Sequence, residues 1–126
     1  MILFVKQKYL TISRIRYIIA AVVEGFVKQS LLYDFYGSLL TQRQREVYEA
    51  YFLENYSLAE TAEGFNISRQ AVYDLIKRCC RLLEEYEEKL GLVERFINIK
   101  EEISKIENCS DLETAKSIAL KIKDML

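Results

Sequence analysis

Residues 69–81 bring together side chains that can contact a nucleic acid. Arginine and lysine bind phosphates, and arginine and glutamine also read base edges in a DNA groove. Wound as an α-helix, the segment gathers its polar side chains on about half of its circumference. These side chains are Arg69, Gln70, Tyr73, Asp74, Lys77, Arg78 and Arg81. The face predicts a nucleic-acid contact, although a solvated face would also be basic. A face that is merely solvated gives the least reason for the aromatic side chain of Tyr73.

The residues before this segment predict how it is positioned. Ser57 and Glu60 form a capping box that opens one helix. Asn66 tolerates the left-handed conformation that ends it, and Ser68 caps the next helix. Two helices joined in this way form a helix-turn-helix, whose second helix lies in a DNA groove. Helical bundles that bind no nucleic acid also contain such segments.

Apolar spacing predicts the interior of this motif. Phe65, Ile67, Val72 and Leu75 have the spacing that holds both helices in one core. The second helix meets no stop signal before Gly91, so we expect it to run to residue 89 or 90. The chain has no proline and four glycines, which favours long helices over a turn-rich β fold.

Two further helices complete a predicted helix-turn-helix domain over residues 24–90. The first covers residues 24–39, with an apolar stripe made of Val27, Leu31, Leu32, Phe35 and Leu39. The second opens with a capping box at Thr41 and Gln44 and extends to about Glu54. Its inward face consists of Val47, Tyr48, Tyr51 and Phe52.

Residues 91–126 predict a C-terminal helical hairpin. One narrow apolar seam is Leu92, Phe96, Ile99, Ile103 and Ile106, and the other is Leu112, Ala115, Ala119, Ile122 and Leu126. A third capping box, Ser110 with Glu113, would open the second helix. The seams either close an antiparallel hairpin on the main domain or pair with a second chain. Because two half-sites add affinity, we expect a homodimer.

The overall charge restricts how a nucleic acid could be bound. The net charge is −1 and the isoelectric point about 5.6, which is unlike a promiscuous nucleic-acid binder. Residues 1–23 hold four of the 18 basic residues and no acidic one, so 14 basic and 19 acidic residues remain. Binding must therefore come from the local face at 69–81. Much of the acid follows it, at Glu84, Glu85, Glu87 and Glu88.

Other residue types argue against metal and catalytic chemistry. The three cysteines, at positions 79, 80 and 109, form no CxxC pair, and there is no histidine. No glycine-rich phosphate loop or GxSxG motif is present. We therefore expect no cofactor, no small-molecule substrate and no enzyme activity. Free thiols favour the cytoplasm, with Cys79 or Cys80 in the core and the other at its periphery.

Residues 1–23 differ in composition from the rest. Four basic residues precede the apolar run 18–23, which is too short to span a membrane and lacks a convincing cleavage site. One interpretation is an upstream translated extension, with the native start near Val22 or Val23. The other is an ordinary extra helix packed on the domain.

Residues 31–88 closely resemble the YlxM-like family of small bacterial helix-turn-helix proteins. The resemblance rests on LLYDFYGSLLT (31–41), YSLAE (56–60), SRQAVYD (68–74), IKR (76–78) and LEEYEEKL (83–90). The chain has Thr61 where the family usually has an aliphatic residue, and Asn66 where it has glycine. Thr61 could loosen the core slightly, whereas Asn66 can still form the turn. The core also resembles region four of bacterial sigma factors, which reads a promoter element.

The resemblance implies a DNA-binding regulator that takes part in the signal recognition particle pathway. Genes of this family typically lie beside the gene for the GTPase of that particle. In this hypothesis Arg69 and Gln70 approach base edges, and Tyr73 meets a thymine methyl group or a phosphate. Ser68 and the free N–H groups of the helix start bind a phosphate. Backbone contacts come from Lys77, Arg78 and Arg81, with Arg43 and Arg45 in addition. The alternative is direct binding to the particle's RNA or GTPase.

Overall fold

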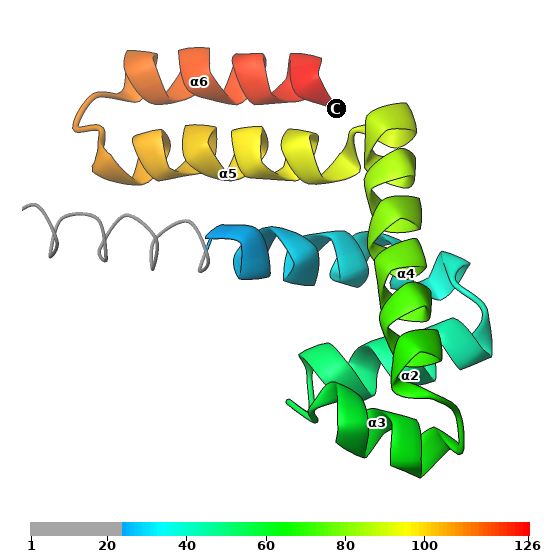
Figure 1. The fold of residues 1–126 in the computed structure, drawn as a ribbon. Coiled ribbons are helices and arrows are strands. Elements are labelled where there is room, and N and C mark those ends of the chain that lie inside the picture. Colours follow the sequence, from blue (N-terminus) through cyan, green and yellow to red (C-terminus); the bar gives the residue numbers. More distant parts are fainter. Residues whose placement is uncertain (1–23) are drawn as a thin grey trace, which may run out of the picture.

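The described part of the chain is all-α, with helices joined by short turns and no strand among residues 24–126, as its composition predicts. The computed structural model describes residues 24–126, and the predicted N-terminal extension, with its start near Val22 or Val23, lies outside them. The chain is helical from residue 24 to residue 36. The later elements (Figure 1) are the 3-10 helix η1 (Gly37–Leu39) and the α-helices α2 (Gln42–Phe52), α3 (Leu58–Phe65), α4 (Arg69–Leu90), α5 (Leu92–Asn108) and α6 (Leu112–Met125).

Side chains cap α2 and α3 where the sequence predicts. The Thr41 hydroxyl accepts a hydrogen bond from the Gln44 N–H, while the Gln44 side chain accepts from the Thr41 N–H. Ser57 and Glu60 form the same capping box at α3. Each box pairs two backbone N–H groups that a helix start otherwise leaves free. Both predicted boxes are therefore confirmed.

The first helix is shorter than predicted, because it ends at residue 36 and continues as η1. Within the predicted apolar stripe Leu32 is buried, whereas Val27 and Leu39 are about half exposed. Tyr36 is buried instead. A Cβ atom at Gly37 would lie 2.9 Å from the ring of Tyr33, so only glycine lets the chain turn this close to that ring.

The end of α2 also differs from the prediction. The helix ends at Phe52 rather than at Glu54, and the N–H groups of Leu53 and Glu54 both donate to the Glu49 carbonyl. Asn55 then adopts a positive φ of 60°. An asparagine can adopt this left-handed conformation, which reverses the chain towards α3.

The buried apolar residues form two clusters on opposite parts of α4. One cluster joins the first helix, α2 and the second half of α4, and it consists of Leu32, Tyr36, Leu40, Tyr48, Cys79, Leu83 and Val93. The other lies between α2, α3 and the first half of α4, and it consists of Val47, Ala62, Val72 and Ile76. Phe65, Ile67 and Leu75 pack against this second cluster, as their spacing predicts. Each half of α4 is thus held in place by its own apolar cluster.

Thr61 is accommodated without an unpaired polar group. It is buried in α3, and its hydroxyl donates to the Ser57 carbonyl at 2.9 Å. A buried hydroxyl is costly only when it lacks a partner. The hydrogen bond therefore offsets the slight loosening of the core that was expected because the family usually has an aliphatic residue at position 61.

A polar junction joins α4 to α5. Gly91 ends α4 in the left-handed conformation, as predicted, and it also precedes α5 without offering a side-chain cap. The Glu87 carboxylate takes over this role by accepting from the N–H groups of Val93 and Glu94, each at 3.0 Å. The buried Tyr36 hydroxyl donates to Glu87 and accepts from the Leu92 N–H. These bonds fix the direction in which α5 leaves the domain.

The predicted C-terminal hairpin is present, formed by α5 and α6 (Figure 1). Its capping residue was predicted wrongly: Asp111, not Ser110, accepts the N–H groups of Glu113 and Thr114. The carboxylate one residue closer to the helix makes both bonds. Between the helices, Glu102 of α5 pairs with Lys121 of α6 at 2.9 Å.

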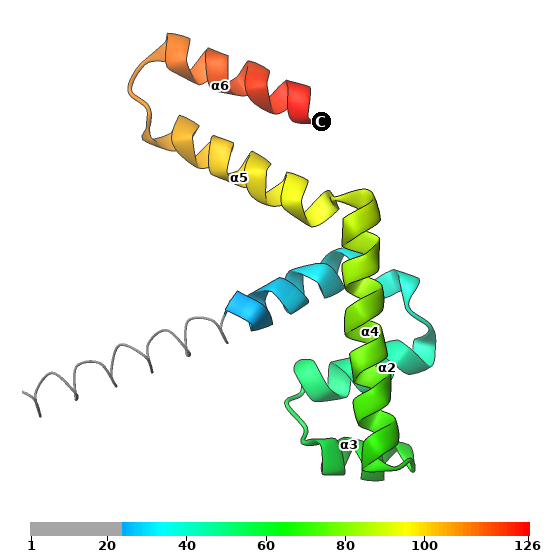
Figure 2. The same ribbon diagram turned by 45° about the horizontal axis from the view of Figure 1, so that its top comes forward.

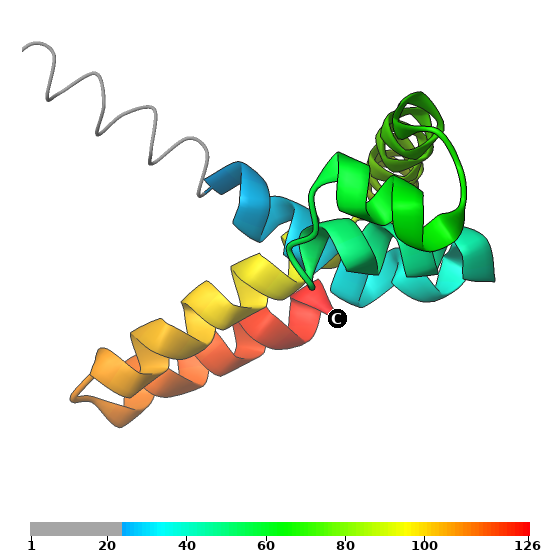
Figure 3. The ribbon, with the colours of Figure 1, turned by 60° about the horizontal axis from the view of Figure 1, so that its bottom comes forward.

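The apolar seam of α6 is also shifted from the predicted one. The half-buried positions on this helix are Ala115, Ile118, Ile122 and Met125, whereas Leu112, Ala119 and Leu126 are exposed. No residue of α6 is fully buried. The hairpin contacts the domain through Val93 and through Phe96, whose ring lies 5.3 Å from that of Phe35. Beyond this contact it extends away from α2 and α3 (Figures 2 and 3).

Among residues 24–126, no helix combines the length and the apolar character that a membrane span requires.

Candidate nucleic-acid interface

The turn between α3 and α4 has the geometry of a helix-turn-helix. Asn66 ends α3 with φ 54° and ψ 45°, and its N–H donates to carbonyls of the last turn. Ser68 is extended, and its hydroxyl accepts the Ala71 N–H at 3.0 Å. Two residues therefore separate Asn66, the left-handed C-cap of α3, from Arg69, the first residue of α4. Figure 1 shows the resulting placement of α3 across the lower end of α4.

The structure exposes every side chain of the predicted polar face. The outer residues of α4 are Arg69, Gln70, Tyr73, Asp74, Lys77, Arg78 and Arg81, and all are exposed. The inner face holds Val72, Ile76, Cys79 and Leu83, all buried. Tyr73 is 48% exposed although it is aromatic, which leaves its ring available to a ligand. The predicted division of the helix is confirmed.

Few of the cations on this face are neutralised. Among the described residues, the one ion pair that α4 makes is between Arg81 and Glu85, at 3.5 Å. Both side chains are well exposed, and an ion pair of this kind contributes little. Arg69, Lys77 and Arg78 have no ion-pair partner within residues 24–126. Their charges are free to act on a ligand.

One acidic residue interrupts the basic face and makes a specific contact. The Gln70 side-chain N–H donates to the Asp74 carboxylate, with Nε2 and Oδ1 3.0 Å apart. These residues are one helical turn apart, a spacing at which side chains meet. In the structure the amide of Gln70 therefore turns its NH₂ group towards Asp74.

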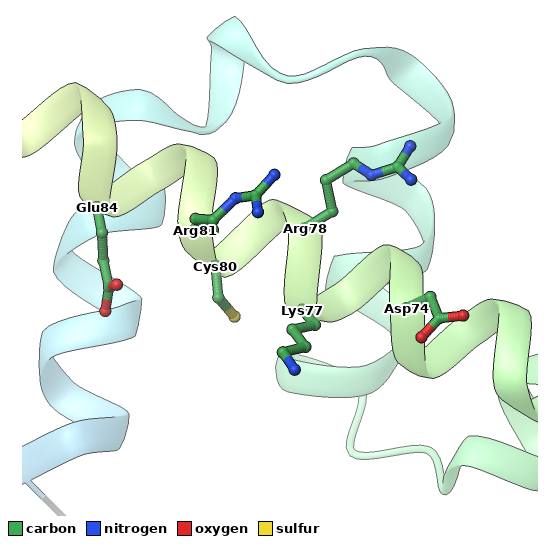
Figure 4. A pocket seen from close by; sticks show the side chains of 6 residues that line it. All are labelled: Asp74, Lys77, Arg78, Cys80, Arg81 and Glu84. Carbon is green, nitrogen blue, oxygen red and sulfur yellow. The ribbon is translucent and has the colours of Figure 1, made fainter.

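Two hollows accompany the face. One of about 430 Å³ lies at the start of α4 and is lined by Leu58, Arg69, Gln70 and Tyr73. Leu58 comes from α3 and was not among the predicted site residues, because its apolar type signals only packing. The other, of about 580 Å³, lies further along α4. Figure 4 shows its lining, with Arg78 and Arg81 extending to one side of the helix and Lys77, Cys80 and Glu84 to the other.

Arg43 and Arg45 lie on α2 and have intramolecular neighbours. The Arg43 guanidinium donates to the Phe65 carbonyl at 3.0 Å and lies 4.7 Å from the centre of the Phe65 ring. Arg43 thus ties the start of α2 to the end of α3. Burial and the Glu49 carboxylate raise the pKa of Tyr33 strongly, and the charge of Arg45 opposes this rise. Backbone contacts from these two arginines remain a prediction.

The cysteines near this face are ordinary thiols. Cys79 is fully buried and Cys80 partly buried, as predicted, and both are free. Burial raises the pKa of the Cys79 thiol to about 11, and burial together with Glu84 raises that of Cys80. Because the thiolate is the reactive form, neither cysteine is activated. The arrangement is thus one of binding groups: cations, an amide and an aromatic ring on one helix.

The fold and this exposed face define a helix-turn-helix protein. The family model described as "Putative helix-turn-helix protein, YlxM / p13 like" matches residues 23–124. The chain therefore belongs to this family, as its resemblance indicated.

Named relatives agree with this assignment. A UPF0122 protein of Caldanaerobacter subterraneus subsp. tengcongensis is 52% identical over 86 residues, which are 68% of this chain and 74% of the relative. One of Halalkalibacterium halodurans is 41% identical over 100 residues, 79% of this chain and 92% of the relative. One of Bacillus cereus is 54% identical over 74 residues, 59% of this chain and 67% of the relative.

Proposed function

We propose that this protein binds double-stranded DNA selectively through the outer face of α4 and acts as a regulator. The observation that carries the proposal is the exposed basic face at the start of the second helix of a helix-turn-helix. The family description, a helix-turn-helix protein, supports it, because such motifs commonly place their second helix in a DNA groove. A major groove about 12 Å wide admits one helix, so the first turns of α4 would enter it.

Each side chain of the face has a role in this proposal. Arg69 and Gln70, in the first turn of α4, approach base edges, and Tyr73 contacts a thymine methyl group. Lys77, Arg78 and Arg81 bind the phosphate backbone. At the helix start, the Ser68 hydroxyl accepts the Ala71 N–H and keeps its own proton for a phosphate oxygen. The positive end of the helix dipole favours the same phosphate.

We also propose that two copies of the chain associate through the hairpin. Large apolar side chains remain on its surface, namely Phe96, Ile97, Ile103, Leu112, Leu120 and Leu126. A second copy would cover them and would present two α4 helices to two half-sites. Because the local face carries few cations, two half-sites supply affinity that one cannot.

A second candidate is binding to the RNA or the GTPase of the signal recognition particle. The observation that favours it is the acidic end of α4, where Glu84 and Glu88 are exposed. These carboxylates repel DNA phosphates but suit a basic protein surface. In this case the basic face would bind structured RNA through its shape and phosphates.

The test is selection from a library of random duplex DNA with the full chain, together with binding to the particle RNA over a salt series. We expect an enriched DNA motif that is lost in the double variant Arg69→Ala, Tyr73→Ala. Arg95→Ala is the matched control, since Arg95 is an exposed arginine on α5, away from the face. Weak binding without a motif, together with tight binding to the particle RNA, would replace the DNA proposal with the second candidate.

A further inference from the structure

Asp74 is the one acidic side chain on a face proposed to bind a polyanion. A carboxylate there repels phosphates and therefore weakens general binding to DNA. It accepts a hydrogen bond from Gln70 at 3.0 Å, and both side chains are exposed. Exposed side chains on a helix surface gain little stability from such a bond. The bond biases the orientation of the Gln70 amide.

The chemistry of the two groups fixes the direction of the bond. A carboxylate only accepts hydrogen bonds, so the Gln70 amide must turn its NH₂ group towards Asp74. One of the two amide hydrogens is thereby used. The second hydrogen and the carbonyl oxygen Oε1 remain available side by side. Gln70 can thus offer an N–H donor and the Oε1 acceptor to a base at the same time.

This donor–acceptor pair matches one base in the major groove. Adenine presents N7 as an acceptor beside the N6 amino group as a donor, whereas guanine presents two acceptors. A glutamine held in this way can bind adenine through both groups at once. Without Asp74, the amide could rotate by half a turn and lose this preference.

The surroundings of Gln70 suit the same base pair. The hollow beside it is lined by the side chains of Leu58 and Tyr73 in addition to Arg69. The thymine that pairs with adenine places its C5 methyl group in the major groove. An apolar leucine and an aromatic ring provide a surface for that methyl group.

We propose that Asp74 is a positioning residue that orients Gln70 to read an A·T base pair in the DNA site. The inference rests on the proposed DNA-binding function. Gln70 is the specificity-determining residue in direct contact with the base, and Asp74 acts through it. The acid is thus part of the reading mechanism rather than a flaw in the basic face.

The test begins with the motif that the full chain enriches from random duplex DNA. We expect one adenine in that motif whose preference is lost in Gln70→Ala. Replacing this adenine by 7-deazaadenine removes the N7 acceptor, and replacing it by purine removes the amino group. Each replacement should weaken binding by the wild-type chain by about 5- to 100-fold, and should have no effect on Gln70→Ala. Uracil in place of the paired thymine should also weaken binding.

Asp74→Asn separates positioning from charge. Asparagine keeps the size of the side chain but can donate as well as accept, so it no longer fixes the Gln70 amide. We expect discrimination at this one base pair to fall by about twofold, as the weak exposed bond allows, while binding to unrelated DNA becomes stronger. Glu88→Gln, which removes an exposed charge from the same helix, should leave discrimination unchanged.

The alternative outcomes are distinct. An enriched motif in which Gln70→Ala alters no adenine would overturn the inference and leave the proposed function intact. Full discrimination in Asp74→Asn would reduce Asp74 to a charge effect. Absence of any DNA binding by the wild-type chain would overturn both proposals together.

Discussion

At the residue scale, the side chains of the basic face divide by what they can distinguish. A guanidinium can bind guanine through two hydrogen bonds, whereas an ammonium is a point charge that binds any phosphate. Arg69 lies in the first turn of α4 and Lys77 two turns further along. We therefore expect Arg69 to carry sequence preference and Lys77 to carry general affinity.

Arg69→Ala should weaken binding to the enriched DNA site by about 1–3 kcal/mol and relax the preference at one base pair. Lys77→Ala should weaken binding to all sequences alike and lower the slope of log K against log salt by about 1. Titrations of specific and unrelated duplexes at several salt concentrations measure both effects. Equal loss on both duplexes in Arg69→Ala would remove this residue from base reading.

Asn66 is the residue on which the turn depends most directly. Its φ of 54° lies in the left-handed region, which costs a residue with an ordinary Cβ about 1–2 kcal/mol. Asn66→Ala should therefore lower the free energy of unfolding by about 1 kcal/mol, whereas Asn66→Gly should be neutral or stabilising. Urea denaturation followed by circular dichroism provides the measurement. A loss in Asn66→Gly equal to that in Asn66→Ala would show that the asparagine side chain, not its backbone conformation, matters.

At the element scale, local signals predicted the helix starts and long-range contacts decided the rest. The capping boxes of α2 and α3 were found because each lies within four consecutive residues. At α6 two adjacent residues could act as the cap, and the spacing alone favoured Ser110 over Asp111 wrongly. The role of Leu58 beside the site depends on how α3 crosses α4, which no local pattern contains.

The junction between α4 and α5 illustrates the same limit. In the sequence Glu87 is one of four acids that follow the basic face, yet its carboxylate caps α5 and accepts from Tyr36, 51 residues earlier in the chain. Burial opposes ionisation of Glu87, but hydrogen bonds from Tyr36 and from the N–H groups of Glu94 and Val93 outweigh it. The pKa of Glu87 is therefore lower than its usual 4.5. Such a partner could not be identified from the spacing of residues within one helix.

This junction predicts a dependence of stability on pH. A carboxyl with a lowered pKa in the folded state stabilises the protein above its unfolded pKa, and this stability is lost as the pH falls through the folded value. Glu87→Gln should therefore lower the free energy of unfolding by about 1 kcal/mol at pH 7, with a smaller difference at each pH below 4.5.

The measurement is urea denaturation of both proteins from pH 7 to pH 3. Glu88→Gln is the matched control, because Glu88 is an exposed neighbour, and it should differ little from the wild type throughout. A constant difference between wild type and Glu87→Gln over the whole pH range would argue against the capping role of the ionised carboxylate.

At the scale of the whole molecule, residues 24–126 form a packed helix-turn-helix bundle and a hairpin that projects from it (Figure 3). Sequence periodicity predicted both parts, but it could not tell a seam that closes a hairpin from one that pairs two chains. In the structure α5 and α6 cover one side of each other and leave Leu112 and Leu120 about two-thirds exposed. These side chains are where a second copy would gain most from burial.

The predicted dimer can be tested by removing this surface without disturbing the domain. Wild-type protein should have twice the 14.8 kDa mass of the chain in light scattering after size-exclusion chromatography. The double variant Leu112→Glu, Leu120→Glu should be a monomer, because two carboxylates cannot be buried without partners. Leu53→Glu is the control: Leu53 is similarly exposed but follows α2, and this variant should remain a dimer.

DNA binding gives this experiment a second readout. A monomer with an intact α4 should bind one half-site as the wild-type chain does. On the full site it should lose the gain from linkage, which is about 100-fold or more when both half-sites are spanned. Equal affinity of monomer and wild type for the full site would mean that each domain acts alone. A wild-type mass of 14.8 kDa would instead show that the exposed hairpin does not pair two copies of this chain.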